Sequence, residues 1–246
     1  GDYPAAHEAI AICLREKEGL AQGDPLNVNW RWRLSDGYRT EGRLYMYQGK
    51  LERGKQSYQN AYERIAEFAK KDPTNLRLQW QLAEAHAGIA RNSVELEHKA
   101  GVVRLETLAH AKDAVIISDT LVKTDRDNTT WFLANTVSHM VDARVTQLTE
   151  GPHAALPKIK LTYEQCQELG SNDVISLEAK LEHVEAGCRF AELLRETGDV
   201  TGAEGIRREV QALLDSLRSR IPSSGWLAKL EQAIARNAPV SSVLYP

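Results

Sequence analysis

The sequence predicts an all-α protein, an α-α superhelix (solenoid) of about ten antiparallel helices stacked as right-handed pairs. An Asp-x-x-Asn turn recurs at residues 24–27, 72–75 and 125–128. A ring side chain lies fourteen residues after each leading Asp, at Tyr38, His86 and His139. A small residue fills one further equivalent position, at Gly42, Ala90 and Ala143. Self-similarity at a period of about fifty residues is typical of helical repeats, in which each unit buries its apolar face against its neighbours.

Caps and breakers delimit the expected helices of the first half. Pro4, suited to a first helical turn, begins a helix that ends at Gly23. Asn27, Asn75 and Asn128 are placed to cap the second, fourth and sixth helices. The third helix carries an apolar stripe over residues 51–68, and the apolar residues from Val102 to Leu121 mark a fifth. We read Asp125 and its neighbours as part of a cap, because the glycine and distal Glu of a calcium loop are missing.

The second half is expected to continue the array after an interruption. Gly151-Pro152 together with Pro157 predicts a loop, followed by four helices at about residues 158–169, 173–197, 200–220 and 225–236. Asn172 precedes His183 by eleven residues, as Asn75 precedes His86. The sequence thus predicts repeats over residues 1–150 and degenerate repeats over residues 151–246. No segment alternates with period two, so we expect no sheet.

Composition narrows the classes of partner. The 246-residue chain has a formal net charge of −3, which argues against nucleic-acid binding. Arginines alternate with aromatic side chains over residues 30–43, but Asp36 and Glu41 interrupt them, which favours a solvated helix face. No apolar run reaches the eighteen or so residues of a membrane span, so no direct membrane insertion is expected. The abrupt start at Gly1 indicates an excised domain, so the missing signal peptide says little about compartment.

Residues 49–92 resemble a tetratricopeptide repeat. The resemblance rests on Gly49-Lys50, Tyr58, Ala61 and Tyr62, the turn at 72–75, and Leu82-Ala83 with His86. It is good over about residues 24–92, fair to 145 and weak beyond. A Trp early in the unit and a His at the aromatic position are similar to divergent repeats of bacterial signalling proteins, including eukaryote-like Ser/Thr kinases and nucleotide cyclases. The resemblance implies a module in the bacterial cytoplasm or periplasm, carried by a membrane-anchored parent.

The repeat length departs from that family. Tyr38 to His86 spans 48 residues, His86 to His139 spans 53, and His139 to His183 spans 44 (86 − 38, 139 − 86 and 183 − 139). The family repeat is about 34 residues long. The helices must therefore be longer than usual.

The resemblance also supplies candidate site residues. Aligning Leu82 and Ala83 with the family signature places Trp32 and Trp80 on the inner helices, whose exposed face lines a concave groove in that family. The predicted partner-binding set is completed by Asp36, Arg39, Arg77 and Glu84. Aromatic anchors among charged groups suit a protein or peptide partner. The alternative is that the tryptophans, with Trp30, Trp131 and Trp226, pack in the core.

The histidines and cysteines are expected to be structural. His86, His139 and His183 would suggest zinc, but equivalent positions in stacked helix pairs lie about 10 Å apart, whereas zinc needs its nitrogens at about 2 Å. We therefore predict no metal and no cofactor. Cys13, Cys166 and Cys188 lack metal-site spacing and are expected to be buried thiols, with a Cys166–Cys188 pair as the alternative.

The expected function is a non-catalytic interaction or sensor module. The sequence has no phosphate-cradling GxxxxGK[ST], no GxGxxG, no HExxH and no GxSxG. Two alternatives stay open. One is a homodimerisation scaffold that uses exposed apolar faces around Trp226 and Leu230. The other is a small-ligand receptor with a pocket near residues 151–157.

Overall fold

The computed structural model describes residues 3–170, 177–218, 225–236 and 238–245, and within these ranges it contains only helices and connections. The all-α prediction is confirmed. The described helices are α1 (Tyr3–Gly23), α2 (Val28–Tyr47), α3 (Leu51–Lys71), α4 (Leu76–Ala100), α5 (Leu105–Thr124), α6 (Thr129–Glu150), α7 (Pro152–Gly170), α8 (Leu177–Glu196), α9 (Val200–Arg218), α10 (Gly225–Arg236) and α11 (Val240–Leu244). None of these helices is long and apolar enough to cross a membrane.

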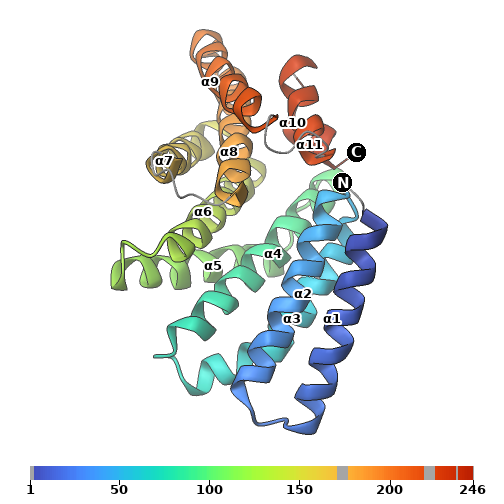
Figure 1. Cartoon of the computed structure of the whole chain (residues 1–246). Coiled ribbons are helices and arrows are strands. Elements are labelled where there is room, and N and C mark those ends of the chain that lie inside the picture. Colours follow the sequence, from blue (N-terminus) through green and yellow to red (C-terminus); the bar gives the residue numbers. More distant parts are fainter. Residues whose placement is uncertain (1–2, 171–176, 219–224, 237, 246) are drawn as a thin grey trace. The chain divides into compact units, whose positions relative to one another are not determined.

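The chain divides into two compact units, and the division falls inside α6, between Ser138 and His139. In the N-terminal unit, described from residue 3 to 138, helices α1 to α5 each pack against the next helix in the chain (Figure 1). Helix α2 also contacts α4. Because α3 connects them as the return arm of two hairpins, α2 and α4 run parallel to each other. The sequence placed its own division at residue 150.

The three predicted asparagine caps are confirmed. The Oδ1 atom of Asn27 accepts a hydrogen bond from the backbone N–H of Asn29 at 3.1 Å. Asn75 accepts from Leu78 N–H at 3.3 Å, and Asn128 from Trp131 N–H at 3.2 Å. Each cap satisfies a backbone donor that the first helical turn leaves without a partner.

The repeated ring and small-residue positions lie where helices pack closely. Tyr38 and His86 are buried, and His139 is half-buried. The ring of Tyr58, from α3, is buried between Gly42 of α2 and Gly88 of α4. A Cβ at Gly42 would lie 2.7 Å from the Tyr58 ring, and one at Gly88 only 2.2 Å from it. These two glycines therefore let three successive helices approach around one aromatic ring.

In the C-terminal unit, described over 139–170, 177–218, 225–236 and 238–245, α8 is the central helix. It packs against α7, α9, α10 and α11. Its buried core includes Ala186, Phe190 and Leu193, which contact Ile159 and Tyr163 of α7. The prediction of a helix at 158–169 was too short, because the helix begins at Pro152.

The expected loop at residues 151–157 was wrong. The turn is confined to Gly151, whose φ of 95° is the left-handed conformation that glycine adopts without strain. Pro152 begins α7, where its missing N–H would have no helical partner, and Pro157 lies inside the helix. Pro157 has no N–H to donate to the His153 carbonyl, and both residues are exposed. Gly101, also in the left-handed conformation, caps the end of α4. Helix α5 begins at Leu105, whereas the sequence predicted a start near Val102.

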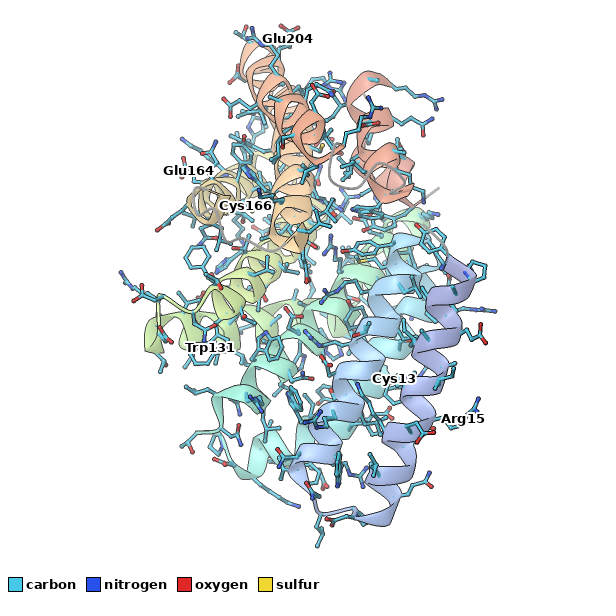
Figure 2. The ribbon with its side chains drawn as sticks, viewed as in Figure 1. Cys13, Arg15, Trp131, Glu164, Cys166 and Glu204 are labelled. Carbon is cyan, nitrogen blue, oxygen red and sulfur yellow. The ribbon has the colours of Figure 1, made fainter. Side chains whose placement is uncertain are left out.

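The cysteines follow the predicted pattern in two cases of three. Cys166 and Cys188 are buried free thiols, whereas Cys13 is exposed. Figure 2 labels Cys13 on α1. The neighbouring Leu14, not Cys13, is the buried residue of that turn. The alternative of a Cys166–Cys188 disulfide is not found.

Candidate functional site

One face shared by α2 and α4 carries all six of the predicted binding residues; we call it the α2–α4 face. Of the six, Arg77 is exposed, Arg39 is buried and the other four are half-buried. Trp32, Asp36 and Arg39 follow one another at helical spacing on α2, and Arg77, Trp80 and Glu84 do so on α4. Residues that recur every three to four positions share one side of a helix. Because α2 and α4 run parallel, the two stripes run in the same direction.

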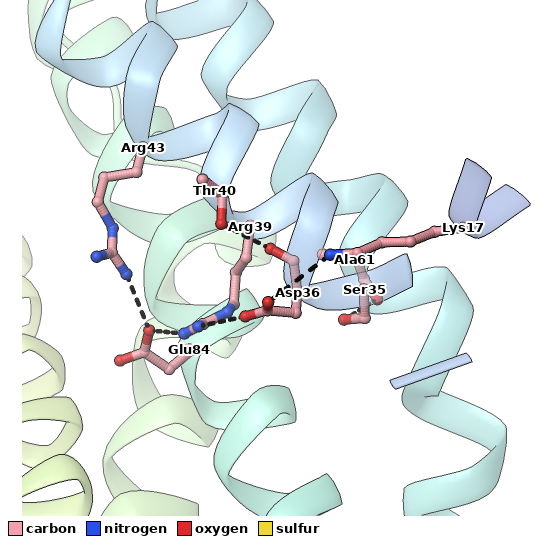
Figure 3. A network of polar contacts seen from close by, with 8 residues as sticks. All are labelled: Lys17, Ser35, Asp36, Arg39, Thr40, Arg43, Ala61 and Glu84. Atoms are coloured by element: carbon pink, nitrogen blue, oxygen red, sulfur yellow. Dashed lines mark hydrogen bonds and ion pairs between the residues drawn. The ribbon is translucent and has the colours of Figure 1, made fainter. Parts of the chain in front are cut away.

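Arg39 is the centre of this face. One terminal nitrogen, Nη1, donates to the Glu84 carboxylate, and the other, Nη2, donates to Asp36 Oδ1 at 3.1 Å (Figure 3). The guanidinium carbon also lies 4.6 Å from the centre of the Trp80 ring. Only 6% of Arg39 is exposed, so this charge depends on its two carboxylates. The network fixes the position of α2 against α4.

Further cations surround these carboxylates. Arg43 Nη2 lies 3.7 Å from Glu84 Oε2, and Lys17 Nζ of α1 lies 4.0 Å from Asp36 Oδ2 (Figure 3). Sequence reasoning assigned Arg43 to a solvated face and gave Lys17 no polar role. Their approach to the same two carboxylates depends on how α1, α2 and α4 pack, which no local pattern in the chain reports.

Trp32 lies between two arginines at the start of the face. The guanidinium carbon of Arg77 lies 4.7 Å from the Trp32 ring centre, and that of Arg33 lies 5.7 Å from it. Both arginines are exposed, and within the described ranges neither has a carboxylate within salt-bridge distance. Arg33 was not among the predicted site residues, although it is one position from Trp32.

Three hydrogen-bond donors on the α2–α4 face have no acceptor. They are the indole N–H groups of Trp32 and Trp80 and the Nε–H of Arg39. All three atoms are buried, and a buried donor without an acceptor is destabilising. Because these atoms are buried, an acceptor on a bound molecule could reach them only after the side chains move.

The face is positively charged although the chain is not. Five cationic side chains (Lys17, Arg33, Arg39, Arg43 and Arg77) meet two anionic ones (Asp36 and Glu84), a balance of 5 − 2 = +3. The whole chain has a formal charge of −3. This local excess makes the face attractive to anionic groups.

Two of the repeated histidines, His86 and His183, contact rings within their own units. His86 pairs with His110 of α5, with their Nδ1 atoms 2.7 Å apart, and the Tyr62 ring contacts both. His183 contacts the Tyr163 ring in the C-terminal unit. No group of three or more His, Cys, Asp or Glu side chains in the described ranges has the arrangement of a metal site.

The His86–His110 pair makes stability dependent on pH. Burial and the neighbouring His110 lower the pKa of His86 from 6.5 to about 4. The unfolded chain therefore takes up a proton at His86 in this window while the folded protein does not, so stability falls as pH falls from 6.5 towards 4. Asp113, Glu106 and Lys55 are the other charges that act on the pair.

We expect protonation of His86 in the unfolded chain to lower the free energy of unfolding by about 2 kcal/mol between about pH 7.5 and about pH 5. Urea unfolding at both pH values gives the loss of stability on acidification for the wild type and for His86→Gln. The difference between these two losses is the contribution of His86. His98→Gln, at an exposed position on the same helix, is the control and should behave as the wild type does. Equal pH dependence in the wild type and His86→Gln would refute the assignment.

Two cavities lie within single units, and neither is lined by residues 151–157. One, of about 530 Å³, is an open hollow between α3 and α4 near Tyr62, Leu82 and His86. The other, in the C-terminal unit, has room for about one water at 20 Å³. Its Glu192 accepts a hydrogen bond from Val240 N–H, and burial raises the pKa of the Cys188 thiol to about 12. That thiol is therefore protonated and unreactive at neutral pH.

The expected dimerisation patch around Trp226 and Leu230 was wrong. Trp226 is 3% exposed and Leu230 is fully buried within the chain. The Trp226 ring lies 5.9 Å from that of Tyr245, which follows α11, a short helix that the sequence did not indicate. This C-terminal segment covers the apolar side chains that were expected to be free.

Comparison of the chain with family models, with curated proteins and with solved structures found no significant match in any of the three.

Proposed function

We propose that the chain is a non-catalytic interaction module that binds a segment of a partner protein along the α2–α4 face. The observation that supports this most directly is that all six predicted residues lie on one face, in two contact groups: Arg39 with Asp36, Glu84 and Trp80, and Trp32 with Arg77. Tryptophan and arginine are the side chains most enriched among residues that dominate binding energy.

The length of the face sets the length of the segment. Trp32 and Arg43 are eleven positions apart, which corresponds to about 16 Å along a helix. An extended peptide covers that distance with about five residues. The resemblance of residues 24–92 to tetratricopeptide repeats supports the same mode of binding. On that resemblance we also propose that the parent is a bacterial signalling protein such as a Ser/Thr kinase, which this module regulates.

A selection of random peptides displayed on phage, with the full chain as bait, tests the proposal. We expect Trp32→Ala and Trp80→Ala each to weaken the selected peptides about thirtyfold in titration calorimetry, the loss typical of a central anchor. Trp131→Ala, at the start of α6, is the matched control and should bind normally. Thermal melts establish that each variant is folded. Selected peptides that bind both site variants with unchanged affinity would contradict the proposal.

A further inference from the structure

The charge and hydrogen-bonding pattern of the α2–α4 face indicates what kind of segment it binds. We propose that the bound segment is acidic, and that Arg33 and Arg77 bind its carboxylates across the Trp32 ring. This inference rests on the proposed function and specifies its ligand. It follows from two observations: exposed arginines without a carboxylate partner, and the end of the helices at which they lie.

The arginines of the face fall into two groups. Arg39 and Arg43 share the carboxylates of Asp36 and Glu84, so their charges are largely balanced. Arg33 and Arg77 have no carboxylate partner in the described part of the chain, and their contacts are with aromatic rings. A guanidinium that lies over a ring keeps its outward N–H groups available for a carboxylate. The two sets of N–H groups therefore surround one tryptophan.

The exposed donors of the face favour an acceptor-rich ligand. Arginine side chains can only donate hydrogen bonds, and Arg33 and Arg77 are both exposed. The acceptors present, Asp36 and Glu84, are already used by Arg39. An acidic segment brings acceptors for the two exposed arginines. A basic segment would add donors and place like charges beside Arg33 and Arg77.

The position along the helices favours the same sign of charge. Trp32 lies in the second turn of α2 and Arg77 in the first turn of α4. Because the helices run parallel, both positive N-terminal ends lie at this end of the face. The carboxylates of the segment are therefore expected over Trp32, and the uncharged part of the segment is expected towards Trp80.

Fluorescence anisotropy with labelled peptides of about five residues tests this inference on the full chain. The acidic probe carries Glu residues around one Leu; its counterparts replace every Glu by Gln, by Lys or by phosphoserine. We expect the acidic probe to bind at least about tenfold more tightly than the Gln probe, and to weaken as salt is raised. The Lys probe should not bind.

The double variant Arg33→Gln, Arg77→Gln is expected to weaken the acidic probe about tenfold and to remove its advantage over the Gln probe. Arg53→Gln is the matched control, because Arg53 is an exposed arginine over the Tyr45 ring on the same unit. It should leave binding unchanged. Both substituted arginines are exposed, so the double variant is expected to fold, and its thermal melt checks this.

The outcomes separate the inference from the proposed function. If the Glu and Gln probes bind equally and both lose binding in Trp80→Ala, the inference that the segment is acidic is overturned. The proposal that the α2–α4 face binds a partner would then stand. Binding of the phosphoserine probe alone would replace carboxylate by phosphate and overturn the inference. Failure of every probe here, together with failure of the random selection to yield a peptide, would overturn both. An acidic probe that is insensitive to the double variant would show that its carboxylates bind elsewhere.

Discussion

Gly88→Ala is expected to lower the free energy of unfolding by about 2 kcal/mol or more, although alanine is the better helix former. The added Cβ would lie 2.2 Å from Cδ1 of the Tyr58 ring, much closer than two carbons can approach. The ring cannot move away, because Tyr58 is 6% exposed and Gly42 of α2 lies against its other side. Helix α3 would therefore have to move relative to α4. Urea unfolding followed by circular dichroism measures the loss.

Gly19→Ala supplies a control with the opposite sign. Gly19 lies within α1, and a Cβ there would meet no atom within 4 Å. The same substitution should raise the free energy of unfolding by about 1 kcal/mol, because only helix propensity changes. The pair of glycines thus separates steric conflict from propensity. If Gly88→Ala proved as stable as Gly19→Ala, the close packing of α2, α3 and α4 around Tyr58 would be wrong.

Glu84→Gln is expected to lower the free energy of unfolding by about 2 kcal/mol, because it leaves the buried Arg39 with only one carboxylate. The Glu84 side chain is 15% exposed and that of Arg39 is 7% exposed, so water compensates poorly. Asp36 still pairs with Arg39 at 3.1 Å, which keeps the loss below that of a fully unpaired buried charge. Urea unfolding at neutral pH measures it.

Glu164→Gln is the matched control for this substitution. Glu164 lies on α7 (Figure 2), where its carboxylate is 3.9 Å from Lys160 and both side chains are more than half exposed. An exposed pair of this kind contributes less than about 1 kcal/mol. We also expect Arg39→Met to recover part of the loss when combined with Glu84→Gln, because the unpaired charge is then removed. Equal effects of Glu84→Gln and Glu164→Gln would mean that the Arg39 network does not fix α2 against α4.

The features that the sequence predicted well are those encoded by local chemistry or by repeat register. Asn27, Asn75 and Asn128 cap helices because a short amide side chain satisfies donors two or three residues away. The α2–α4 face could be predicted because equivalent positions in successive repeats lie on the same side of parallel helices. Those positions follow from spacing alone once Leu82 and Ala83 are aligned with the repeat signature.

The features that the sequence did not predict depend on packing between distant residues. His110 pairs with His86 only because α5 folds against α4, and no spacing rule links the two positions. Pro157 was taken as a helix breaker, but it lies inside α7 at an exposed position. Trp226 was taken as an exposed anchor because α11, which accompanies it, is too short to give a periodic pattern.

The most direct test of the interaction face uses the indole N–H signals in proton–nitrogen correlation spectra. The chain has five tryptophans, so at most five such signals are expected, assigned by single substitution. They are recorded while the tightest peptide from the display selection is added. We predict that the signals of Trp32 and Trp80 shift with the peptide, while those of Trp131 and Trp226 stay in place. Shifts at Trp131 or Trp226 with unchanged signals for Trp32 and Trp80 would contradict it.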